Sequence, residues 1–205
     1  WVSLLVAGLI VLSYITLGGL SAAIYNEVLQ FFAIIAALAP LTIIGLNRVG
    51  GWIGLKDAVA QESHFHTWPG TDISGFENPV WSVIGIVLGL GFVLSFGYWT
   101  TNFVEVQRAM ASDSISAARK TPIIGAFPKM FVPFLVVIPG MVASVSVADL
   151  MEERAEPNDA ILLLMRDLLP NGLLGVAIAG LLASFMAGMA ANISAFNTVI
   201  SYDIW

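Results

Sequence analysis

The sequence predicts an all-α protein that crosses a membrane several times. Of its 205 residues, 58% are hydrophobic and only 11% are charged, whereas soluble domains carry about 25% charged residues. The hydrophobic residues gather in long runs, and a helix needs about 20 such residues to cross a hydrocarbon core of about 30 Å. The strict alternation of a membrane β-barrel does not occur in them.

Five hydrophobic segments are predicted to be membrane helices. The first is short for a complete span, and neither end of the chain carries a start methionine, a leader peptide or a polar tail, so we expect both ends to be cuts through a longer protein. The last four are long enough to cross with some tilt, at 1.5 Å per residue. The segments are residues 1–17, 20–46, 79–107, 122–147 and 172–205.

The charges of the connecting segments predict which side of the membrane they face. Residues 108–121 hold three basic side chains in 14 positions, whereas the longer segments 47–78 and 148–171 hold two each and are rich in acid. Basic residues favour the cytoplasmic side in short loops. We therefore expect 108–121 to be an inner loop and the other two to be outer loops of a multi-pass plasma-membrane protein, with a bacterial inner membrane as the expected location.

Composition also excludes several functions. The net charge of −6 argues against nucleic acid as a partner. The chain has no cysteine, which excludes disulfides and thiolate metal sites. His64 and His66 lie in a predicted outer loop without a third ligand at metal spacing. With no catalytic cluster in the sequence, we expect neither an enzyme nor an organic cofactor.

The third and fourth segments are predicted to be irregular helices. Each glycine in a helix costs roughly 1 kcal/mol relative to alanine, and an internal proline frees a backbone carbonyl. Broken membrane helices are tolerated where protein or a water-filled cavity meets them, and they commonly form a transporter's substrate site. The alternative is that the glycines serve only packing. The residues concerned are Gly85, Gly89, Gly91 and Gly97, and then Pro122, Pro128, Pro133 and Pro139.

Two charged residues fall inside hydrophobic segments. Glu27 lies about 10 Å of helix beyond the Gly18–Gly19 pair. Lys129 lies nine residues beyond Lys120, and about 10 Å into the fourth segment if that segment starts near Pro122. A charge at depth costs at least about 2.5 kcal/mol. Glu27 is either a cation-binding carboxylate, in one polar stripe with Asn26 and Gln30, or an interfacial residue that reaches water. Lys129 either binds a polar solute or a carboxylate, or reaches the interface along its flexible stem.

The third segment carries a polar and aromatic face. Tyr98, Asn102 and Glu105 stand at i, i+4 and i+7, and Ser95 and Trp99 form a neighbouring i, i+4 pair. An aromatic ring offers a stacking surface and an amide offers hydrogen bonds, a combination that suits a sugar-like solute. The alternative is an aromatic belt at the membrane interface.

Two further patterns predict packing. Glu105 and Arg108, three residues apart, are expected to pair at the cytoplasmic end of the third segment. Small residues recur along the fifth segment, a pattern typical of close helix contact. They are Gly180, Ser184, Ala187, Gly188 and Ala191.

Four blocks of this sequence resemble the sodium:solute symporter family. They occur in the family's order and with its spacing, and together they cover nearly the whole chain. The blocks are YITLGGLSAAIYNEVLQFF (14–32), GYWTTNFVEVQRAMA (97–111), FPKMFVPFLVVIPGMVA (127–143) and LLPNGLLGVAIAGLLASFMAGMAANISAFNTVISYDIW (168–205). The resemblance implies a LeuT-type inverted-repeat fold of two five-helix units, of which this chain would hold core helices four to eight.

The resemblance also implies roles for individual residues. Tyr98 matches the tyrosine of the inner gate, which covers the solute, and Trp99 follows it as in animal sugar carriers. Lys129 matches a lysine that hydrogen-bonds sugar. Ser95 matches a position where some members place a polar residue on the substrate.

For the coupling ion, the resemblance is less complete. Glu27 matches an aspartate on the inner sodium path. Ser184, Ala187 and Gly188 match the sodium-binding positions, but where the family has two adjacent serines this chain has Ala187–Gly188. Two oxygens are therefore missing from a site for a hard cation. Backbone carbonyls, water, Ser184 and Glu27 could still bind sodium; alternatively Glu27 takes a proton, or transport is uncoupled.

These observations predict a secondary active transporter. We expect sodium-coupled symport of a small polar, sugar-like solute by alternating access, with the solute, sodium and the bilayer as partners. The alternatives are a proton-coupled or uncoupled transporter, and a membrane sensor that reuses a transporter fold. The pattern does not predict an oligomeric state.

Overall fold

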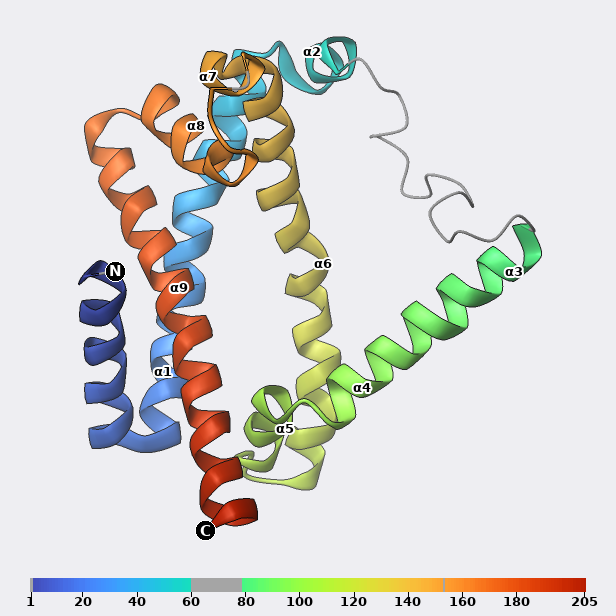
Figure 1. The fold of residues 1–205 in the computed structure, drawn as a ribbon, viewed down its shortest axis with the longest axis vertical. Coiled ribbons are helices and arrows are strands. Elements are labelled where there is room, and N and C mark those ends of the chain that lie inside the picture. Colours follow the sequence, from blue (N-terminus) through green and yellow to red (C-terminus); the bar gives the residue numbers. More distant parts are fainter. Residues whose placement is uncertain (1, 60–78, 153) are drawn as a thin grey trace. The chain divides into compact units, whose positions relative to one another are not determined.

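The computed structural model describes residues 2–59, 79–152 and 154–205, and all regular elements in these ranges are helical (Figure 1). The predicted all-α class is thereby confirmed. The chain forms two compact units. The first consists of Trp1–Ala58 together with Phe127–Trp205, and the second is Val59–Ala126. The helices are α1 (Val2–Arg48), α2 (Gly51–Ala58), α3 (Pro79–Ile84), the π-helix η3 (Gly85–Leu94), α4 (Ser95–Thr100), α5 (Phe103–Met110), α6 (Ile115–Ser146), α7 (Ala148–Met151), the 3₁₀-helix η4 (Pro157–Asp159), α8 (Ala160–Leu168), α9 (Asn171–Val199) and the π-helix η5 (Ile200–Ile204).

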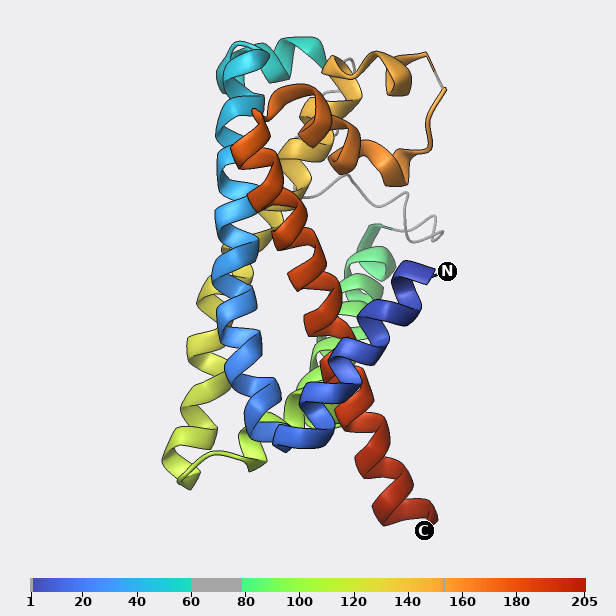
Figure 2. The same ribbon diagram turned by 90° about the vertical axis from the view of Figure 1, so that its left-hand side faces the viewer.

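Four stretches in the described part of the chain are long and hydrophobic enough to span a membrane, where the sequence predicted about five segments. The difference lies in α1, which combines the expected segments 1–17 and 20–46. A straight 47-residue helix would measure about 70 Å, more than twice the hydrocarbon thickness. The chain instead turns at Gly19, whose φ of 63° and ψ of −159° suit glycine, so α1 forms two arms that leave the turn in roughly the same direction and open away from each other (Figures 1 and 2). The four stretches are Val2–Arg48, Val80–Thr100, Ile115–Ser146 and Asn171–Ile204.

The second arm of α1 packs closely against α9. A Cβ atom placed on Gly180 would lie 2.3 Å from the Cβ of Ala37 and 2.9 Å from the carbonyl oxygen of Ala33. Only glycine allows this approach, which confirms the close helix contact predicted for the fifth segment at this position. Gly188 differs, because a Cβ there would meet no atom within 4 Å.

The third predicted segment, 79–107, is not one helix. It begins as α3, continues as the ten-residue π-helix η3 and returns to α geometry in α4, which ends at Thr100. Thr101 has φ −120° and Asn102 has φ −72° and ψ 105°, so the chain leaves the helix before α5 starts. The glycines noted in the sequence fall in and beside the π-helix, where they weaken regular α geometry.

The fourth helix begins earlier than predicted. α6 starts at Ile115 rather than near residue 122, because the Ser114 hydroxyl caps it by accepting a hydrogen bond of 3.2 Å from the Ala117 amide. The expected inner loop 108–121 is therefore reduced to residues 111–114, between the end of α5 and the start of α6. The four predicted proline interruptions all fall inside α6 without ending it.

The predicted outer loops also contain helices. Residues 47–78 include α2, and 148–171 include α7, η4 and α8. In the second of these, Asp149 binds both Arg154, at 3.5 Å, and Arg166, at 3.2 Å, and so ties α7 to α8. Hydrogen bonds from Arg166 to Asp167 and Asp149 raise the pKa of this arginine above its ordinary value.

Candidate functional site

The break between α4 and α5 is built from a turn and a helix cap. The amides of Thr101 and Asn102 both donate to the carbonyl oxygen of Gly97, at 2.9 and 3.2 Å. The Asn102 side-chain oxygen then accepts from the Val104 amide at 3.1 Å and caps α5. The backbone groups of this stretch find partners in a turn, so Tyr98, Asn102 and Glu105 do not share one continuous helical face, whereas the predicted irregularity of the third segment is confirmed.

Two of the predicted face residues nevertheless meet across the break. The Tyr98 hydroxyl donates a hydrogen bond to the Oε1 atom of Glu105. The Tyr98 ring also packs edge-on against Trp99, with ring centroids 5.5 Å apart at 84°. Glu105 was expected to pair with Arg108, whose guanidinium donates to the Val104 carbonyl; the structure adds Tyr98 as a partner of this carboxylate.

An open hollow of about 650 Å³ lies along the π-helix and the break. Two predicted solute-binding residues, Tyr98 and Asn102, line it, so it presents an aromatic ring and an amide beside hydrophobic surface. Ser95 and Trp99 are not among its lining residues, although both are exposed on α4. The lining consists of Gly89, Leu90, Val93, Leu94, Gly97, Tyr98, Thr101 and Asn102.

Lys129 lies deeper in its helix than the sequence predicted. It is about 21 Å from the start of α6, because that helix begins at Ile115, and it stands near the middle of 32 residues. Its neighbours Phe127, Met130 and Phe131 are each 63% exposed, so the lysine sits on a hydrophobic helix surface. Lys129 belongs to the first compact unit and Tyr98 to the second.

Glu27 belongs to a polar cluster inside the α1 hairpin. Tyr14 of the first arm lies beside Gln30 and Glu27 of the second arm. The Tyr14 hydroxyl lies within hydrogen-bonding reach of the Gln30 side chain, whose buried Oε1 atom has no donor among the described residues. A buried polar atom left unsatisfied costs about 1–3 kcal/mol, so such atoms usually hold water or an ion. Half-buried Glu27 beside the buried Gln30 oxygen therefore suits a hydrated cation.

Tyr14 was not singled out in the sequence. The Gly18–Gly19 pair could have indicated its role. A chain that folds back at these glycines places residues before the turn, such as Tyr14, opposite residues after the turn. The polar stripe of Asn26, Glu27 and Gln30 then has a facing partner that helical spacing within one segment cannot reveal.

The predicted sodium positions lie on one face of α9. Ser184 and Gly188 are exposed and Ala187 is half-buried. The Gly188 carbonyl, which lies inside α9, accepts a hydrogen bond of 2.8 Å from the Asn192 side chain in addition to its helical backbone bond, so both of its lone pairs are occupied. Within the described ranges, no three histidine or acidic side chains gather to hold a metal ion; His64 and His66 lie outside those ranges.

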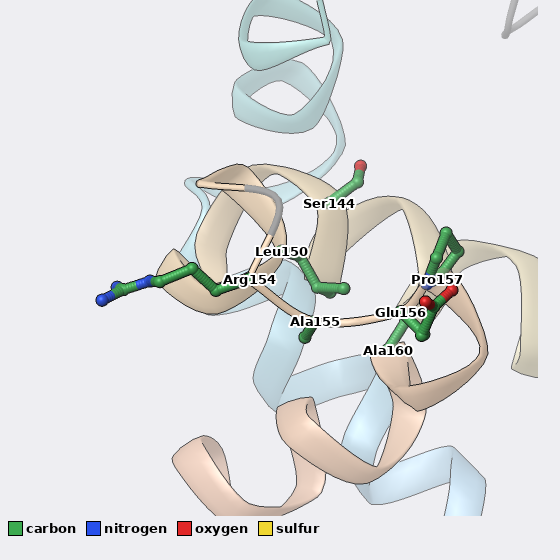
Figure 3. A pocket seen from close by; sticks show the side chains of 8 residues that line it. Ser144, Leu150, Arg154, Ala155, Glu156, Pro157 and Ala160 are labelled. Carbon is green, nitrogen blue, oxygen red and sulfur yellow. The ribbon is translucent and has the colours of Figure 1, made fainter.

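A second hollow, also about 650 Å³, lies where α6 ends against the α7–η4 connection (Figure 3). Ser144, Leu150 and Glu156 contribute to its lining. The Arg154 side chain points away from the other labelled residues in the figure and pairs with Glu152 at 3.1 Å. The sequence predicted only an acidic outer loop for this region, and no spacing pattern in it signals a cavity.

Taken together, the hydrophobic spans, one of them broken beside a hollow, define a multi-pass membrane protein. The model of the sodium:solute symporter family matches residues 1–205, and the chain belongs to this family. The family implies a LeuT-type fold and transport rather than enzymatic catalysis, as the sequence predicted.

Three relatives illustrate the match. The chain is 30% identical to the sodium/glucose cotransporter of Vibrio parahaemolyticus, covering 99% of this chain and 40% of that protein. It is 29% identical to the sodium/mannose cotransporter of Bos taurus, over 94% of this chain and 36% of that protein. It is also 29% identical to sodium/myo-inositol cotransporter 2 of Mus musculus, over 98% of this chain and 34% of that protein. The chain thus spans two fifths or less of the length of these relatives.

Proposed function

We propose that the whole protein, of which this chain forms part, is a sodium-coupled symporter of a small polar, sugar-like solute. The hollow at the break of the third segment carries this proposal, because Tyr98 and Asn102 line it with a ring and an amide. Membership in the sodium:solute symporter family supports it. So do the relatives named for glucose, mannose and myo-inositol, which are all polyhydroxylated solutes.

The mechanism is alternating access. An outside cation binds first and favours the outward-facing state, solute then binds near the midplane, and Tyr98 closes the inner side before it swings away. Trp99 and Ser95 complete the solute-facing part of α4. Lys129 donates hydrogen bonds to solute hydroxyls from the middle of α6. One charge crossing a potential of 100 mV supplies about 2.3 kcal/mol, which can concentrate a neutral solute roughly fiftyfold.

The cation passes from the α9 positions to the α1 hairpin. Ser184 supplies a hydroxyl ligand at the first, beside Ala187 and Gly188, and water completes the shell. Glu27, with the Tyr14 hydroxyl and the buried Gln30 oxygen beside it, accepts the cation on the inner path.

The test is uptake by the full-length protein in proteoliposomes. Labelled glucose, mannose and myo-inositol are each offered with a sodium gradient, with a proton gradient and with neither. We expect sodium-dependent uptake of at least one. Lys129→Ala should lower its uptake by about tenfold or more, as expected for a charge-assisted hydrogen bond, whereas Lys120→Ala at the exposed start of α6 should not. Unchanged kinetics in Lys129→Ala would remove this lysine from the solute site.

Proton coupling is the second candidate, and the Ala187–Gly188 pair favours it because it removes two hydroxyl ligands for sodium. Glu27 would then take the proton. Uptake driven by a proton gradient in sodium-free buffer, and abolished in Glu27→Gln, would support this alternative over sodium coupling.

A further inference from the structure

Glu105 occupies a position where a capping residue is expected but performs a different task. Asn102 and Glu105 form the pattern Asn-x-x-Glu, in which the glutamate normally reaches back to the amide of the capping residue. Here that amide donates to the Gly97 carbonyl at 3.2 Å. The Glu105 carboxylate instead accepts the hydroxyl of Tyr98, seven residues earlier and on the other side of the helix break.

This hydrogen bond links two helices that the backbone leaves separate. Tyr98 belongs to α4 and Glu105 to the first turn of α5, with non-helical backbone at Thr101 and Asn102 between them. The amino end of α5 favours a carboxylate there, because its free amides carry partial positive charge. Bonds to charged acceptors are stronger than bonds between neutral groups. The contact is thus suited to hold the tyrosine in one orientation along the hollow.

We propose that Glu105 is a positioning residue for Tyr98, and that its carboxylate acts as a latch that keeps the tyrosine ring against the hollow. The inference rests on the proposed function, in which Tyr98 is the inner gate. For the ring to swing away, the hydroxyl must leave the carboxylate and both groups must find water. The strength of this one bond therefore sets how often the gate opens.

The test measures gate opening without requiring transport. This chain has no cysteine, so Leu90→Cys places a reporter in the hollow of a full-length protein from which any other cysteines have been removed. Leu90 lines the hollow on the π-helix and lies outside the Tyr98–Glu105 contact. The rate of its modification by a charged thiol reagent, applied from the cytoplasmic side, reports how often the hollow is open.

We expect Glu105→Leu to speed modification about five- to tenfold. Glu105→Gln should give a smaller increase, because its amide oxygen can still accept the hydroxyl. Tyr98→Phe should match Glu105→Leu, and the double variant should be no faster than either single variant, since both changes remove the same bond. Asp113→Asn removes an exposed acidic charge just beyond α5 and should leave the rate unchanged.

Additive effects of Glu105→Leu and Tyr98→Phe, or unchanged modification in Glu105→Leu, would overturn the latch. If Glu105→Leu does not yield a monodisperse protein, Glu105→Gln against Tyr98→Phe decides the question by the same comparison. The proposed function fails separately: a wild-type protein that takes up none of the three solutes contradicts it, whereas the modification rates still test the latch.

Discussion

Glycine has opposite structural roles on α9, where it allows close packing, and in the third segment, where it borders open space. On α9, Gly180 lets a second helix approach until no Cβ could fit between them. Along the third segment, Gly89 and Gly97 border an open hollow, and a Cβ at Gly89 would meet nothing within 4 Å. The first region has a buried helix contact, whereas η3 has no buried residue. The comparison teaches that a small residue in a membrane helix can mark either close packing or a place where the helix departs from regular geometry.

The largest effect is expected at the packed glycine. Gly180→Ala should destabilise the full-length protein by about 1–3 kcal/mol, because the added methyl group must displace Ala37 or the backbone at Ala33. Gly175→Ala on the same helix meets no atom within 4 Å and should be neutral or slightly stabilising. Thermal unfolding in detergent measures both. Equal stability of the two variants would mean that the α1–α9 contact is not as close as described.

The helix break is expected to depend on its cap. Asn102→Ala removes the acceptor for the Val104 amide and should cost about 1 kcal/mol. It should also lower solute uptake, because α5 would lose its defined start beside the hollow. Asn102→Asp keeps the acceptor and should retain most of the stability. A loss of stability as large in Asn102→Asp as in Asn102→Ala would show that the side-chain oxygen does not cap α5.

The open glycine should respond with the opposite sign from the packed one. Gly89→Ala adds a methyl group into open space and should stabilise the helix by about 0.5–1 kcal/mol. The same change favours regular helix over π-helix and narrows the hollow, so uptake should slow. Unfolding temperature and initial uptake rate, measured on one preparation, test the two expectations. A destabilised Gly89→Ala would remove the contrast with Gly180.

The smallest effect is expected on the open face of α9. Gly188→Ser would supply one of the two hydroxyls that the family resemblance leads us to expect, and nothing within 4 Å obstructs it. We expect the sodium concentration for half-maximal uptake to fall about threefold, because sodium gains an oxygen ligand. Gly188→Ala adds a methyl group without an oxygen and serves as the control. An unchanged sodium requirement in Gly188→Ser would separate this position from the ion site.

The class of this protein and the places of its polar residues along each helix could be predicted from the sequence. Composition and the length of hydrophobic runs sufficed for an all-α membrane protein, because lipid offers no hydrogen bonds and the backbone must satisfy its own. Glu27 and Lys129 could be recognised in the same way, since a charge inside a hydrophobic run is costly wherever the helix lies. The i, i+4, i+7 spacing of Tyr98, Asn102 and Glu105 also indicated that these three residues belong to one polar and aromatic cluster.

Which of these residues meet depends on how the chain folds in three dimensions. The turn at Gly19 sets Tyr14 beside Gln30 and Glu27, and the break at Thr101 and Asn102 lets Tyr98 reach Glu105 without a continuous helical face. Likewise, Gly180 faces a neighbouring helix and Gly188 does not. Sequence patterns assume one regular helix, whereas turns, caps and close contacts depend on partners from elsewhere in the chain, which satisfy or displace the local backbone bonds.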